Sequence, residues 1–272
     1  MFHRILLIPL FAYVGWMLYL TLLVDSVYAP YLIPGVVLSA VVIVMAPQID
    51  WWWMNRKPPK IDETFRRMLR DHLPFYGDLS LADKEEFRKR VMLIAESKDF
   101  KSAMDDETIP EDLKMVTAAS LAQVSFYTKD FLLSSHEVVI FYYHPFPTMK
   151  YPTAFHLSET FDEDGVVMFS APDMLQGFLK PETHYPIATH EWAVVWQKQY
   201  PNRLTEADFS WGGLERITGM SSEWIKDRIN RPDVELIPAY ITLALHLPQK
   251  FEQKAPEVLS DIRKALKIHS VV

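Results

Sequence analysis

The sequence predicts an α+β domain that follows two membrane-spanning helices. Two long runs near the N-terminus contain no charged residue, and the rest of the chain shows mainly helical patterns with a few short β-branched segments. The chain has 272 residues, of which 49% are hydrophobic, so the part after the apolar runs can bury a sizeable core.

The first of the two runs covers residues 5–24 and the second covers residues 29–46. Twenty helical residues at about 1.5 Å each span roughly 30 Å, which is the thickness of the hydrocarbon core of a bilayer. Pro30 and Pro34 lie near the start of the second run, where a helix tolerates proline. Residues 1–56 are therefore expected to form a transmembrane helical hairpin in a lipid bilayer.

Basic residues flank this hairpin at both ends. Arg4 precedes the first run, and Arg56, Lys57 and Lys60 follow the second, whereas the connection carries only Asp25. The positive-inside rule then places both ends in the cytoplasm. The expected location is the inner (cytoplasmic) membrane, with two spans and a cytoplasmic soluble domain.

A cleaved signal peptide is the alternative interpretation of the first run. Residues 27–29 resemble a small-residue cleavage site. Pro30 follows this site directly, and a second apolar run comes after it, so the hairpin is the favoured interpretation.

Composition excludes several classes of function. The net charge is −7 although residues 1–60 carry four Lys or Arg against two Asp, so the soluble part is acidic and no nucleic-acid partner is expected. The absence of cysteine excludes disulfides, thiolate nucleophiles and cysteine-based zinc sites. The sequence also contains no P-loop, glycine-rich dinucleotide turn or Gly-x-Ser-x-Gly elbow.

After a stiff linker at residues 57–62, residues 63–272 are expected to form one domain. A capping box at Ser80 predicts a helix through about residue 98, and a proline at position 186 precedes a helix that includes His190. The other expected elements are a helix at 111–127, strands at 138–143 and 165–170, an irregular section punctuated by Trp211-Gly212-Gly213, and helices over 233–267 that Pro248 and Pro256 divide.

The stretch THEWAVVWQ, residues 189–197, begins like the zinc-peptidase motif His-Glu-x-x-His. In that motif two histidines one helical turn apart bind Zn²⁺, and the glutamate activates the bound water. His190 and Glu191 fit the pattern, but Val194 replaces the usual second histidine and cannot ligate a metal. The simpler alternative is a core helix that packs Trp192 and Val195.

Six segments, in order, resemble the Mlc titration factor A family, whose members are glucose-regulated zinc-dependent peptidases. They are LPFYGDLSLADKEEFRKRVMLIAESKDF, IPEDLKMVTAASLAQVSF, VVIFYYHPF, GVVMFSAPDMLQG, IATHEWAVVWQ and VELIPAYITLALHLPQKF. Together they cover about residues 60–267. The resemblance implies a zincin-like metallopeptidase-type domain, here in a divergent, membrane-anchored member.

The resemblance also implies a set of site residues. It places the metal ligands at His190 and Glu235 and the catalytic glutamate at Glu191, whereas Val194 and Arg228 stand where the family has a histidine and a tyrosine. A catalytic zinc normally has three protein ligands and an open fourth position. The sequence therefore indicates a remnant site, with zinc bound weakly or not at all.

Two functions from different classes follow from these features. The first is a non-catalytic regulatory or protein-binding module, a pseudoenzyme with a peptide or protein partner. The second is a zinc-dependent metallopeptidase with an altered ligand set, in which His184 or water supplies the third ligand and Glu191 is the general base.

Overall fold

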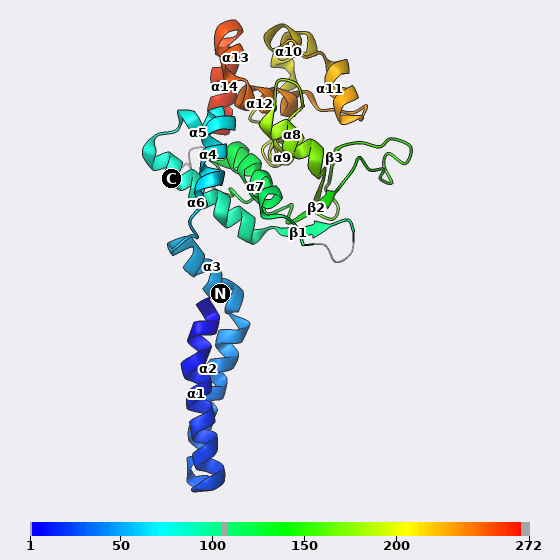
Figure 1. Ribbon diagram of the computed structural model, residues 1–272. Helices are drawn as coiled ribbons and strands as arrows, with labels where there is room; N and C mark the ends of the chain where they lie inside the picture. Colours follow the sequence, from blue (N-terminus) through cyan, green and yellow to red (C-terminus); the bar gives the residue numbers. More distant parts are fainter. Residues whose placement is uncertain (1, 105–107, 268–272) are drawn as a thin grey trace. The chain divides into compact units, whose positions relative to one another are not determined.

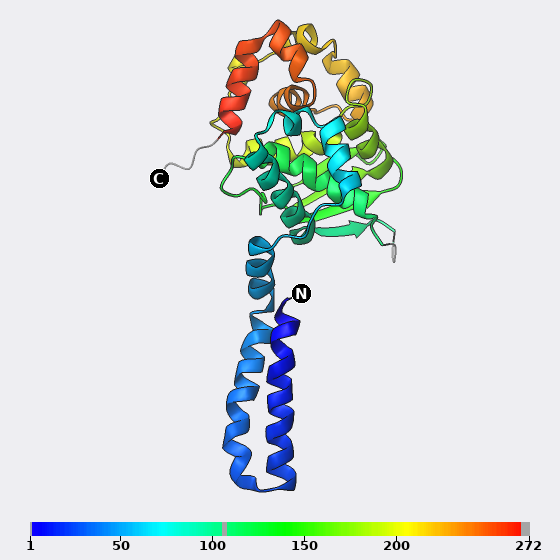
Figure 2. The same ribbon diagram turned by 60° about the vertical axis from the view of Figure 1, so that its left-hand side comes forward.

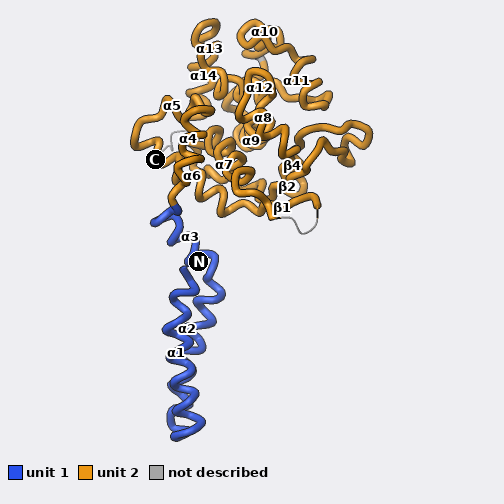
Figure 3. The backbone as a smooth tube through the Cα atoms, viewed as in Figure 1, with its two compact units in different colours: residues 1–59 blue, residues 60–272 orange. Residues whose placement is uncertain are grey.

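The computed structural model describes residues 2–104 and 108–267, and the chain divides into two compact units, 1–59 and 60–272 (Figure 3). Residues 268–272 of the expected domain lie outside the described part. The structure is a mostly helical α+β fold, as the sequence predicts, and its strands form one mixed sheet (Figures 1 and 2).

The first unit contains the two expected apolar helices. Its elements are α1 (Phe2–Leu23), a 3-10 turn (Ser26–Tyr28), α2 (Ala29–Val44) and α3 (Ala46–Arg56). Two helical stretches, Phe2–Leu23 and Ser26–Val44, are long and apolar enough to cross a membrane. Both lie near the N-terminus, where a signal sequence has the same character.

Small residues of α2 allow it to pack closely on α1. A Cβ at Gly35 would lie 2.7 Å from the Tyr13 ring, so a larger residue there would require the neighbouring side chains of α1 to shift. Ser39, one turn later, is also buried and donates its hydroxyl to the Gly35 carbonyl oxygen at 2.8 Å. Small residues four positions apart are a common contact between membrane helices.

The helices of the second unit come before, between and after its strands in the sequence. They are α4 (Glu63–His72), α5 (Pro74–Asp78), α6 (Leu81–Ser97), α7 (Glu111–Ser125), α8 (Ala171–Leu179), α9 (Ile187–Gln199), a 3-10 turn (Glu206–Asp208), α10 (Trp211–Thr218), α11 (Ser222–Ile229), α12 (Leu236–His246), α13 (Pro248–Lys254) and α14 (Pro256–Leu266).

Local sequence signals explain several of these boundaries. Ser80 accepts a hydrogen bond from the Asp83 backbone N–H at 3.1 Å, which confirms the expected cap of α6. Pro248 and Pro256 begin α13 and α14, because proline fits the first helical turn.

The prediction of an irregular section around Trp211-Gly212-Gly213 is wrong, because these residues begin α10. Ser210 caps this helix by accepting from the Gly213 N–H at 3.1 Å. Ser221 caps α11 in the same way, through the Trp224 N–H. The two serine caps stabilise short helices where the glycines had favoured a loop.

The sheet has four strands, β1 (Asp99–Ser102), β2 (Val138–Tyr142), β3 (Ser158–Phe161) and β4 (Val166–Ser170). Their order is β1-β2-β4-β3, in which β1, β2 and β4 are parallel and β3 runs antiparallel to β4. The two expected strands correspond to β2 and β4 in the centre. The two edge strands, β1 and β3, were not predicted from the sequence.

Helix α9 lies in the core of the second unit. Every residue of α9 from Ile187 to Trp196 is buried, and α9 packs against α7, α12 and β3. Trp192 and Trp196 are fully buried. A helix that is buried on all sides places its polar residues in the interior too, where each needs a partner.

Candidate functional site

The start of α9 is held closely against α8. A Cβ at Gly177 of α8 would lie only 2.4 Å from the Tyr185 carbonyl oxygen, so glycine is required for this approach. Pro186 is the residue before the first turn of α9, and the buried Tyr185 hydroxyl lies 2.8 Å from His190 Nδ1. Burial raises the pKa of Tyr185 well above its usual range, so the phenol stays neutral and orients the imidazole.

Glu191 follows His190 and is fully buried. Its Oε1 accepts from Ser158 Oγ at 2.7 Å and from Arg231 Nη1 at 3.0 Å, and its Oε2 accepts from Thr160 Oγ1 at 2.7 Å. Ser158 and Thr160 are two positions apart on β3 and so share one face of the strand. Both carboxylate oxygens therefore already have protein donors.

Glu235 reaches the same place from the start of α12, where it is the residue before the first helical turn. Its Oε2 lies 3.2 Å from Arg231 Nη2 and 3.5 Å from His190 Nε2. Burial alone would raise the pKa of Glu235, but the contact with His190 and the charge of Arg231 lower it to about 2. The structure thus brings together His190, Glu191 and Glu235, the three site residues that the sequence singled out.

Arg231 is the cation at the centre of this cluster. Its side chain is 4% exposed, and besides its two glutamate partners it donates to the Ser158 carbonyl oxygen at 3.0 Å and lies 3.4 Å from Asp233 Oδ1. Burial alone would lower the pKa of Arg231, but the charges of Glu191, Glu235 and Asp233 raise it above its usual value. The guanidinium is a permanent charge that joins the two glutamates.

The residues around His190 do not complete a zinc site. His190 Nε2 has no hydrogen-bond partner in the described chain and faces Glu235, as one pair of ligands would. Val194 is 3% exposed and apolar, and His184 Nδ1 lies 3.0 Å from Thr183 Oγ1. Across residues 2–104 and 108–267, no three His, Asp or Glu side chains are grouped to hold a metal.

The position of Arg231 is a second reason why zinc fits poorly. A metal ion bound by Glu235 would be a second cation beside the guanidinium, and two neighbouring cations repel each other. These residues therefore form a salt bridge, in which one arginine lies between two carboxylates.

Sequence reasoning missed four residues of the site, namely Tyr185, Arg231, Ser158 and Thr160. One feature of the sequence could have indicated Arg231, namely its position four residues before Glu235, a spacing at which an ion pair can form. Arg228, at the position where the resemblance would place a tyrosine, has its guanidinium 5.2 Å from the ring centre of Trp224 on the same helix.

A comparison of the chain with family models, curated proteins and solved structures finds no match. The resemblance to the zinc-dependent peptidases therefore stays a prediction from the sequence. The established result is a helical α+β domain in which His190, Glu191 and Glu235 meet around Arg231.

Proposed function

We propose that this protein is a membrane-anchored, non-catalytic binding module whose buried arginine salt bridge stands where a related peptidase would hold its metal ion. The observation that carries the proposal is the position of Arg231 between Glu191 and Glu235, at 3.0 and 3.2 Å.

The surroundings of Glu191 support a structural role. A general base in metal-assisted hydrolysis must lie within reach of the attacking water and accept its proton. Glu191 is fully buried, and three protein groups donate to its oxygens. A carboxylate in this setting fixes β3 and Arg231 against α9.

The resemblance to the peptidase family supports the remainder of the proposal. A peptidase-type scaffold suits the binding of a peptide or protein, and loss of one ligand leaves the scaffold intact while removing the chemistry. The apolar hairpin and its flanking basic residues would hold this domain on the cytoplasmic face of the membrane.

Peptide hydrolysis by the full chain in a mild detergent tests the non-catalytic part. The substrate is a mixture of quenched fluorescent peptides, assayed with added zinc and with a chelator. We expect the same background rate for the parent, for Glu191→Gln and for the control Glu163→Gln, which changes an exposed carboxylate. Zinc-dependent cleavage that disappears only in Glu191→Gln would overturn the proposal.

Cysteine labelling tests the anchoring, since the chain has no native cysteine. Intact cells would carry either Ser26→Cys, in the turn between α1 and α2, or Glu163→Cys, in the second unit. A membrane-impermeant maleimide should label the first variant directly and the second only after permeabilisation. Labelling of Glu163→Cys in intact cells, or recovery of a chain lacking α1, would contradict a cytoplasmic domain held by two spans.

A zinc-dependent metallopeptidase with an altered ligand set is the second candidate. The observation that favours it is His190 Nε2, which has no hydrogen-bond partner among the described residues and lies 3.5 Å from Glu235 Oε2. Zinc would have to displace Arg231 from Glu235 and recruit a third ligand. The cleavage assay above separates the two candidates.

A further inference from the structure

Positive charge is concentrated in one short segment of the chain, directly after the apolar hairpin. Residues 56–72 contain six Lys or Arg against three Asp or Glu. Residues 73–272, in contrast, contain 21 Lys or Arg against 30 Asp or Glu. The chain is thus basic where the second unit begins, at helix α4, and acidic beyond it.

Helix α4 separates an apolar face from a basic one. Phe65 and Leu69 lie one turn apart and are both buried in the core. Arg70 is four positions after Arg66 and three after Arg67, so these arginines share one face, and all three are exposed. Because the core of the second unit already covers the apolar face, α4 offers a partner its arginines and not its apolar side chains.

The arginines of this face are weakly engaged within the protein. Arg66 forms an ion pair with Glu63 and Arg70 forms one with Asp71, and each of these four side chains is at least 49% exposed. Exposed ion pairs contribute little to stability, so another anion can replace the carboxylate. Arg67 makes no side-chain hydrogen bond or ion pair with any described residue.

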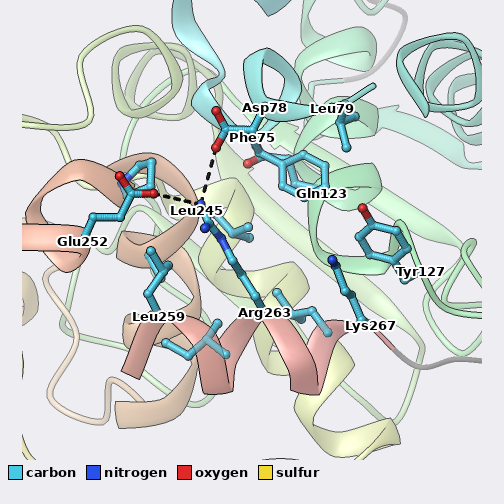
Figure 4. Close-up of a pocket in the computed structure, with 14 residues that line it drawn as sticks. Phe75, Asp78, Leu79, Gln123, Tyr127, Leu245, Glu252, Leu259, Arg263 and Lys267 are labelled. Atoms are coloured by element: carbon cyan, nitrogen blue, oxygen red, sulfur yellow. Dashed lines mark hydrogen bonds and ion pairs between the residues drawn. The ribbon is translucent and has the colours of Figure 1, made fainter. Parts of the chain in front are cut away.

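The edge of a cavity elsewhere in the second unit provides a contrast. Arg263 of α14 lies at this cavity of about 450 Å³, and Figure 4 shows its guanidinium reaching to two carboxylates. Its Nη2 is 3.4 Å from Asp78 Oδ2 and 3.3 Å from Glu252 Oε1. With Lys267, two cations there face two carboxylates, so this edge has no excess of positive charge, whereas the face of α4 has one.

The position of α4 in the chain brings its basic face within reach of a bilayer. Three tryptophans of α3, residues 51–53, follow the second apolar run, as aromatic residues do at a membrane surface. An extended chain covers the seven steps from Arg56, the end of α3, to Glu63, the start of α4, in at most about 25 Å. Basic clusters directly after a membrane span are a common binding surface for anionic lipids.

We propose that Arg66, Arg67 and Arg70 bind the headgroups of anionic phospholipids and so dock the second unit on the membrane surface. The inference rests on the proposed anchoring by the hairpin and adds a second, electrostatic contact to it. A guanidinium pairs with a phosphate group through two parallel N–H donors. Zwitterionic headgroups carry no net charge, so attraction of the whole basic face selects anionic lipids.

A label beside the arginines reports this docking in the full chain. The chain has no native cysteine, and Thr64 is an exposed residue of α4, so Thr64→Cys takes a single fluorophore. The labelled chain is inserted through its hairpin into nanodiscs that contain a lipid with a spin-labelled headgroup, which quenches only nearby fluorophores. Discs of phosphatidylcholine alone are compared with discs that also contain phosphatidylglycerol. We expect stronger quenching in the anionic discs, and its loss in about 1 M salt, where the Debye length is about 3 Å.

The variant Arg66→Gln/Arg67→Gln/Arg70→Gln removes the positive face and keeps polar side chains at exposed positions. Each basic residue near an anionic membrane surface strengthens binding about fivefold. The ratio of docked to undocked chain should therefore fall roughly tenfold or more in this variant. The comparison of lipids and of salt uses only the labelled parent, so it holds even if the variant fails to fold.

The control Lys101→Gln/Lys129→Gln/Lys264→Gln removes three exposed cations from elsewhere in the second unit and should dock like the parent. Equal quenching in neutral and anionic discs would overturn the proposal and leave the basic face to an acidic protein partner. An arginine variant that docks as well as the control would also overturn it. A chain that does not co-purify with the nanodiscs would instead refute the anchoring by the hairpin, and this inference with it.

Discussion

Replacing Arg231 by methionine should destabilise the second unit severely. The variant keeps an apolar side chain of similar length but leaves Glu191 fully buried without its cation. Removing one partner of a buried ion pair costs about 3–5 kcal/mol, and the two hydroxyl donors on Glu191 do not supply the missing charge. Leaving Glu235 without its cation costs less stability, because its side chain is 40% exposed and water can solvate it.

The assay is urea denaturation of the full chain in a nonionic detergent, followed by tryptophan fluorescence, to which the buried Trp192 and Trp196 contribute. The double variant Arg231→Met/Glu191→Gln should lose about 1–3 kcal/mol less than the sum of the two single changes, because it leaves no unpaired buried charge. Arg67→Met, at an exposed position, is the control and should shift stability by less than about 0.5 kcal/mol. An Arg231→Met variant as stable as this control, or strictly additive losses, would show that Arg231 does not neutralise Glu191.

Three further predictions concern other parts of the chain. Burial lowers the pKa of His246 to about 4, below its usual 6.5. Between pH 6.5 and pH 4 the unfolded state therefore binds more protons than the folded state. The free energy of unfolding should fall as pH drops through this range, by up to about 3 kcal/mol in total. A pH series of urea midpoints checks this, and His246→Gln should remove this part of the pH dependence. A chain that begins at Lys60 should be soluble and folded without detergent, because the second unit is compact by itself; aggregation in size-exclusion chromatography would show that the hairpin is needed for folding. Gln123→Met should be more stable than the parent by about 1–3 kcal/mol, since it removes a buried amide that has no hydrogen-bond partner among the described residues; a lower urea midpoint would show that the amide has a partner.

Local patterns in the sequence were enough to predict much of the scaffold. The serine before α6, the prolines that begin α13 and α14, and the β-branched runs of β2 and β4 are all signals carried by neighbouring residues. The edge strands β1 and β3 are four residues long and rich in polar side chains, so they lack the apolar run that marks a buried strand.

The centre of the candidate site could not be predicted in the same way. His190 and Glu191 are recognisable because the motif is local, and Glu235 entered through the family resemblance. Arg231 is forty residues from Glu191 in the sequence, and only the folded chain shows that the two side chains meet. The hydroxyls of Ser158 and Thr160 likewise gain their role only because β3 lies beside α9.

The zinc content of the parent chain, measured by elemental analysis after equilibration with zinc in detergent, tests whether Arg231 takes the place of a metal ion. Val194→His and Val194→His/Arg231→Met are measured beside it, with His190→Ala as the control. If Arg231 takes the place of the metal, the parent binds no stoichiometric zinc, and the double variant, which regains a histidine and loses the guanidinium, binds the most. One zinc per parent chain, lost in His190→Ala, would show that a metal site survives beside Arg231 in this scaffold.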